Sequence, residues 1–139
     1  MWQGVLDKAG KAAQRQDWAT AEGTLLAAAD RKGVPPTVWF QLGKVMFMQR
    51  KLPEAQKWFQ KAAEAVPNVP DGWFELGRAL AADKRFEDAV KALHRALALD
   101  PDNGQAHRFA CVAARESGDM ELAQRHADEM TRLGEPMVG

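Results

Sequence analysis

Histidine and cysteine are the side chains of this sequence with the greatest capacity for chemistry, and two of them stand close together. His107 and Cys111 are four residues apart, which places them on one face of a helix. Imidazole nitrogen and thiolate sulfur are both ligands for zinc and related metals. A metal site also needs a third or fourth ligand, and the sequence offers none at a matching spacing. We therefore expect no metal site, and we interpret Cys111 as a small buried thiol at a packing position.

The other groups that could act in catalysis do not form a recognisable site. His94 and His126 are expected on helices without a serine, cysteine or carboxylate partner, and Ser117, the only serine, lies in a predicted turn. The sequence contains no glycine-rich phosphate-binding motif. Two acidic pairs lie near predicted helix N-termini, where negative charge favours the helix dipole. These pairs are Asp71/Glu75 and Glu87/Asp88. We therefore expect no enzymatic activity and no cofactor.

A pattern with a fixed period runs through the middle of the chain. At least six pairs of positions that are 34 residues apart, without a gap, carry the same residue type. Six of them are Trp39/Trp73, Leu42/Leu76, Gly43/Gly77, Ala55/Ala89, Ala62/Ala96 and Pro67/Pro101. The first three positions of each copy lie at i, i+3 and i+4, which is one face of a helix. The large tryptophan and the small glycine predict close packing of this helix against the next one.

This signature resembles the tetratricopeptide repeat, whose pattern is Trp-x2-Leu-Gly, then Ala-x3-Phe, then Pro. Two copies carry the structural repeat signature. The first consists of Trp39, Leu42, Gly43, Ala55, Phe59, Ala62 and Pro67, and the second of Trp73, Leu76, Gly77, Ala89, Leu93, Ala96 and Pro101. The resemblance implies an all-α fold, an α-solenoid of about four helix-turn-helix repeats. Its roughly eight helices would wind into a right-handed superhelix.

The same register extends to both sides and predicts a single domain of residues 2–135. Its repeats are expected at about 2–35, 36–69, 70–103 and 104–135, followed by a tail of residues 136–139. The outer two repeats are degenerate, and in the last one His107 and Cys111 occupy the positions of Trp73 and Gly77. Helix caps such as Asp17 and stops such as Gly118 mark the helix ends. In the two complete repeats the helices are predicted over about 36–49, 53–66, 70–83 and 86–99.

The resemblance also implies a binding surface, because in this family the first helix of each repeat lines the concave face. The stripe beside the packing face of these helices carries aromatic and basic side chains. Its members are Phe40, Lys44, Phe47, Phe74, Arg78, Arg108, Val112 and Arg115. Aromatic anchors beside cations suit an extended or helical peptide with apolar and acidic residues. Alternatively, these aromatic side chains only support the packing between repeats.

Composition excludes several other classes of partner. The 139 residues include 19 basic and 19 acidic side chains, whereas a nucleic-acid-binding protein normally has a basic excess. No apolar run approaches the roughly 20 residues that span a bilayer, and the N-terminus lacks the pattern of a signal peptide. We therefore expect neither nucleic-acid binding nor membrane insertion. The single cysteine leaves cytoplasm and periplasm both open, and the alanine- and arginine-rich composition is typical of bacterial proteins.

Three functions are consistent with these patterns. The first is a non-catalytic scaffold that binds a peptide or helix of a partner protein. The second is a structural module that forms homo-oligomers through the solenoid ends. Residues 1–69 carry 10 basic and 6 acidic side chains, and residues 70–139 carry 9 and 13, so opposite poles could attract each other. The third is a regulatory or chaperone domain of a larger protein.

Overall fold

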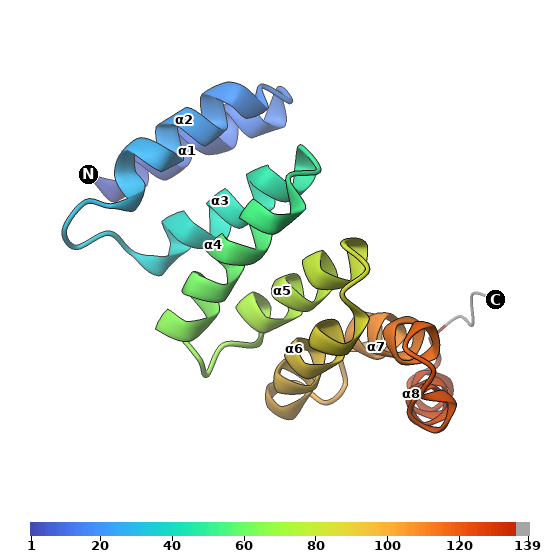
Figure 1. Cartoon of the computed structure of the whole chain (residues 1–139). Coiled ribbons are helices and arrows are strands. Elements are labelled where there is room, and N and C mark those ends of the chain that lie inside the picture. The colour runs from blue at the N-terminus through green and yellow to red at the C-terminus, as the bar shows by residue number, and fades with distance from the viewer. Residues whose placement is uncertain (136–139) are drawn as a thin grey trace. The chain divides into compact units, whose positions relative to one another are not determined.

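The computed structural model describes residues 1–135 of the chain, and within this range the fold is all-α, with eight helices and no strand (Figure 1). The predicted tail of residues 136–139 lies outside the described residues. The helices are α1 (Trp2–Gln14), α2 (Trp18–Ala29), α3 (Pro36–Met48), α4 (Leu52–Ala65), α5 (Pro70–Ala82), α6 (Phe86–Leu99), α7 (Gly104–Glu116) and α8 (Met120–Arg132). The four helices predicted in the two complete repeats agree with α3 to α6 to within one residue at either end.

The helices belong to two compact units, each of which is an array of consecutive helical hairpins. The first unit, Met1–Val66, contains α1 to α4, and the second begins at Pro67 and contains α5 to α8. In the first unit each helix packs against the next one along the chain. The same holds in the second unit, where α5 also contacts α7. The single domain expected over residues 2–135 stays a prediction.

Helix starts follow from capping side chains and from proline. Pro36 and Pro70 are the first residues of α3 and α5, where a proline loses no hydrogen bond. Asp17, Asn103 and Asp119 precede α2, α7 and α8, and each accepts a hydrogen bond from a backbone N–H in the first turn. Each of these three side chains thereby satisfies one of the backbone N–H groups that a helix leaves unpaired at its start.

The turns within the four hairpins share one backbone conformation. Gln16, Arg50, Lys84 and Gly118 are spaced by 34 residues, and all have positive φ, between 59° and 89°. The left-handed region is unfavourable for a residue with a Cβ atom, so three of the four turns hold a strained residue. Only Gly118 was predicted, because glycine is the usual signal for this conformation.

Glycine serves close approach rather than turn formation at the seams of the two complete repeats. A Cβ atom added to Gly43 would lie 2.5 Å from the ring of Phe59, and one added to Gly77 would lie 2.6 Å from Cγ of Leu93. Phe59 and Leu93 are among the largest fully buried side chains of the described residues. The first helix of each hairpin therefore touches the second through its backbone, and the space is filled from the second helix alone.

Candidate functional site

The predicted binding stripe in the first unit lies on α3 and is only partly open to solvent. Phe40 is half-buried, and its ring centroid lies 5.8 Å from that of Phe59 in an edge-to-face arrangement. The ammonium of Lys44 lies 5.5 Å from the Phe40 ring centroid, within the range of a cation–π contact. Phe47, one turn further along, is also half-buried. Phe40 thus both supports the packing of α3 on α4 and presents part of its ring beside a cation.

In the second unit the stripe runs over α5 and α7, which contact each other. Phe74 of α5 and Phe109 of α7 are half-buried and form an edge-to-face pair with centroids 5.9 Å apart. Both rings pack on a buried cluster formed by Leu93, Leu97, Ala106 and Ala110. Phe109 was not among the predicted binding residues. Phe109 follows Arg108 directly and its ring contacts that of Phe74. This contact depends on the packing of α5 against α7 and could not be read from the spacing within one helix.

The arginines of this stripe already have partners within the chain. The guanidinium of Arg78 lies 3.5 Å from the carboxylate of Glu75, and that of Arg108 lies 3.6 Å from Glu135, which follows α8. Nε of Arg108 is buried and has no hydrogen-bond partner among the described residues. Both side chains are about one-third exposed, at 33% and 35%. Ion pairs with this exposure contribute little stability, so an external carboxylate could replace the internal one at small cost.

The last two predicted residues of the stripe lie further along α7. Val112 is exposed, and Arg115 points back along the helix so that its guanidinium lies 3.8 Å from Sγ of Cys111. Cys111 itself is buried, at the position where the two preceding repeats have glycine. An exposed valine between two arginines adds apolar surface to the same helix.

A second group of polar side chains lies elsewhere in the second unit, and the sequence alone did not reveal it. Nε2 of His94, on α6, lies 3.0 Å from Nε2 of His126, on α8. Nδ1 of His126 lies 2.9 Å from Nδ1 of His107, on α7. All three histidines of the chain therefore form one chain of imidazoles. The one feature of the sequence that could have indicated this group is that all three histidines lie within residues 94–126. Their contact could be predicted only once the packing of α6, α7 and α8 was known.

The position of His107 in this group follows from the repeat. Nε1 of Trp73 donates a hydrogen bond to the carbonyl oxygen of Pro67, at 3.1 Å. Nε2 of His107 lies 2.8 Å from the carbonyl oxygen of Pro101, 34 residues later in both partners. His107 thus performs the anchoring contact of the tryptophan that it replaces. Its second nitrogen, which an indole lacks, is free to bind His126.

Burial shifts the titration of two of these imidazoles. Burial, and after it the charge that would sit on His94 and His107, lower the pKa of His126 to about 4, while Glu129 acts in the opposite direction. The pKa of His94 is also lowered, mainly by burial and secondarily by His107. The described residues contain no group of three or more His, Cys, Asp or Glu side chains arranged to hold a metal ion.

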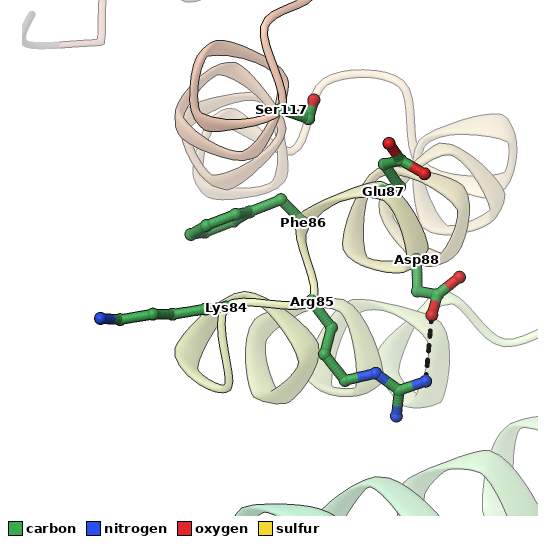
Figure 2. A pocket seen from close by; sticks show the side chains of 6 residues that line it. All are labelled: Lys84, Arg85, Phe86, Glu87, Asp88 and Ser117. Carbon is green, nitrogen blue, oxygen red and sulfur yellow. Dashed lines mark hydrogen bonds and ion pairs between the residues drawn. The ribbon is translucent and has the colours of Figure 1, made fainter.

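The surface also has an open hollow of about 370 Å³ beside the turn between α5 and α6 (Figure 2). Lys84 and Phe86 project to one side of this turn, while Arg85 turns to the other and forms a 3.1 Å ion pair with Asp88. The hydroxyl of Ser117 donates to the carbonyl oxygen of Ala114. These pairings within the chain leave the hollow without a set of converging groups that would define a ligand.

The described helices include none that is long and apolar enough to cross a membrane.

A comparison with curated proteins finds no match. Solved structures do match. MamA residues 41 to the end from Desulfovibrio magneticus RS-1 is 17% identical with a TM-score of 0.87, covering 96% of this chain and 76% of that chain. MamA of AMB-1 is 27% identical with a TM-score of 0.78, covering 94% and 75%.

A third structure is described as YrrB, a tetratricopeptide repeat protein with an unusual peptide-binding site. It is 18% identical with a TM-score of 0.84, covering 93% of this chain and 66% of that chain. The sequence profile of the tetratricopeptide repeat family matches residues 36–69 and 70–103, which are the two complete repeats predicted from the 34-residue period. This match identifies residues 36–103 as two repeats of the tetratricopeptide repeat family, and the eight described helices agree with the all-α fold of that family.

Proposed function

We propose that this protein is a non-catalytic interaction module that binds a peptide or helix of a partner protein through the first helices of its repeats. The observation that carries the proposal is the Phe74–Phe109 ring pair of the second unit, because α5 and α7, the two helices that carry the rings, are in contact and also carry Arg78 and Arg108. Phenylalanine and arginine are both enriched in protein interfaces relative to the rest of the protein surface.

The chemistry of this surface favours a ligand with apolar anchors and acidic residues. A carboxylate of the ligand would exchange with Glu75 or Glu135 at the two arginines, which are now held in weak, solvent-accessible ion pairs. An aliphatic or aromatic anchor would cover the exposed edges of the two rings and the exposed Val112. On α3 of the first unit, Phe40 and Lys44 present the same combination of ring and cation.

The likeness to solved structures agrees with this proposal without adding a partner. One matching structure is described as having a peptide-binding site, and its identity of 18% carries the fold alone. We extend peptide binding to this chain because its own half-buried aromatic residues and nearby basic residues favour it.

A selection from a phage-displayed library of random 12-residue peptides tests the proposal, with the wild-type chain as bait. We expect the enriched sequences to combine aromatic or aliphatic residues with Asp or Glu. The Arg78→Glu/Arg108→Glu variant should then bind an enriched peptide at least about tenfold more weakly, measured by isothermal titration calorimetry.

A matched control separates the site from the overall charge. The Lys91→Glu/Arg125→Glu variant changes the net charge equally, through exposed residues of α6 and α8, and should bind within about twofold of the wild type. Circular dichroism should show that both variants keep their helices. Equal losses in the two variants, or enriched peptides without acidic residues, would contradict the proposed site.

A further inference from the structure

The three-histidine chain has one arrangement of protons at neutral charge, because it ends on a carbonyl group. The oxygen of Pro101 can only accept, so Nε2 of His107 must carry a proton and Nδ1 must accept. His126 must then donate from Nδ1 and accept at Nε2, and His94 must donate from Nε2. Three contacts therefore share three protons, and each N···N contact holds a single one.

We propose that this histidine chain is a pH-sensitive latch, which holds α8 against α6 and α7 when the imidazoles are neutral and releases it when a further proton must enter a contact. The latch joins three helices through ring contacts of 3.0 and 2.9 Å. His107 and His126, which form the inner contact, are each only 7% exposed.

An added proton has one harmless place and two disruptive ones. At Nδ1 of the exposed His94 it leaves both ring contacts intact. At Nε2 of His126, or at Nδ1 of His107, it puts two N–H groups head to head across a distance of about 3 Å. Two donors cannot share that distance, so the rings must separate or a neighbour must change its tautomer. A charge already on His94 also opposes a second charge on the adjacent ring.

The surroundings offer little to stabilise a second charge. Glu129, one turn after His126 on α8, favours its protonation, and it also pairs with Arg132 at 2.8 Å. Asp102, in the loop before α7, is bound to the same Arg132. Next to the histidines on α6 and α7, the charged neighbours are cations. The other charged groups on these elements are Glu87, Asp88, Lys91 and Arg95 on α6, Asp100 in the loop, Arg108, Arg115 and Glu116 on α7, and Glu121, Arg125 and Asp128 on α8. Glu87 and Asp88 lie in the first turn of α6 and Glu116 is the last residue of α7, so each is at least six residues from the histidine of its own helix.

The apolar cluster that holds the helix to be released is small: Ala123, Ala127 and Met130 of α8 pack with Cys111 and Ala114 of α7. The buried residues of α8 are Ala123, His126, Ala127 and Met130, whereas α6 buries Leu93 and Leu97 as well as three alanines. His126 is thus one of the two large side chains that α8 buries. Because α8 buries only two large side chains, losing the contacts of His126 weakens the packing of α8 more than losing one polar contact would weaken the packing of α6.

The direction of the pH effect follows from the lowered pKa of His126. An imidazole whose pKa is about 4 in the closed form and about 6.5 when released binds protons more readily in the released form. The closed form is therefore fully favoured above about pH 6.5 and is progressively lost as the pH falls toward 4.

Hydrogen–deuterium exchange of the full chain tests the latch, in buffer with EDTA at pH 7.5 and 4.5. Labelling times are scaled to the intrinsic exchange rate, and the protection of α8 amides is expressed relative to that of α6 amides. We expect this ratio to fall at least tenfold in the wild type between the two pH values. A ratio that stays constant would overturn the proposal.

The control is the His107→Trp/His126→Ala variant, which copies the Trp73 and Ala92 pair of the preceding repeat and keeps every carboxylate. Its ratio should change by less than about twofold, and a loss as large as that of the wild type would assign the effect to the carboxylates instead. The His94→Gln variant gives a second test if the double variant does not fold. An amide can donate or accept, so its contact with His126 survives protonation, and α8 should stay protected at pH 4.5. Wild-type-like loss in His94→Gln would contradict the latch.

Discussion

The α5–α6 and α7–α8 hairpins have the same geometry and are held together by different chemistry. Trp73, Gly77 and Leu93 form the seam of the first, and His107, Cys111 and Ala127 occupy the same positions in the second. Tryptophan and histidine both donate to a proline carbonyl six residues earlier, and the glycine–leucine pair is exchanged for a cysteine–alanine pair of more even volume. A repeat can therefore lose its signature and keep its geometry, but it exchanges apolar burial for polar contacts, which depend on protonation.

The largest expected effect tests the apolar side of this comparison. Trp73 is 4% exposed and lies under the guanidinium of Arg95, 4.4 Å from its ring centroid. Trp73→Ala should lower the free energy of unfolding by about 3–5 kcal/mol, because it leaves a cavity and an unpaired carbonyl at Pro67. His107→Ala should cost only about 1–3 kcal/mol at pH 7.5, where mainly hydrogen bonds are lost.

Urea denaturation followed by circular dichroism at 222 nm gives both values. The wild type measured at the same pH is the reference, and equal costs for the two variants would show that the hairpins are held together in the same way.

An intermediate effect tests the exchange of volume across the seam. Gly77→Leu should cost about 1–3 kcal/mol, since even its Cβ atom would lie 2.6 Å from Leu93. The Gly77→Cys/Leu93→Ala variant copies the pair of the following repeat and should lose less stability than the sum of its two single variants. A double-mutant cycle of urea midpoints measures this coupling, and strict additivity would contradict volume exchange.

The smallest expected effect concerns the turns within the two hairpins. Here the degenerate α7–α8 hairpin has the favourable residue, glycine, and the α5–α6 hairpin has the strained one. Lys84 has a φ of 61° between α5 and α6, and Gly118 has a φ of 89° between α7 and α8. Lys84→Gly should stabilise the chain by up to about 1 kcal/mol, and Gly118→Ala should destabilise it by a similar amount. Thermal melts of the two variants beside wild type would show it, and a lower melting temperature for Lys84→Gly would contradict the strain at this turn.

Much of the fold followed from local sequence alone. The period of 34 residues and the prolines in first turns predicted α3 to α6 to within one residue, because a helix is defined by contacts between residues a few positions apart. The glycine at position 118 was equally readable. Its counterparts Gln16, Arg50 and Lys84 were not, because their left-handed conformation is imposed by the hairpin on residues that do not favour it.

The predicted binding residues could be identified only in part from the sequence. The sequence predicted which helix faces carry Phe74, Arg78 and Arg108, and the structure shows that Glu75 and Glu135 pair with the two arginines. A pairing over three residues is local, but the contact between Arg108 and Glu135 requires the end of α8 to return to α7. That this surface binds a peptide remains a prediction, which rests on the sequence and on the structure together.

The amino-acid sequence by itself determined the helices of residues 36–103 and their membership in the tetratricopeptide repeat family, because both depend on spacing along the chain. Only the tertiary structure placed His94, His107 and His126 in one hydrogen-bonded chain. Their separations of 13, 19 and 32 residues follow no helical period, and they meet because three helices pack side by side. Side chains that share no local pattern can be joined only by the packing of the elements that carry them.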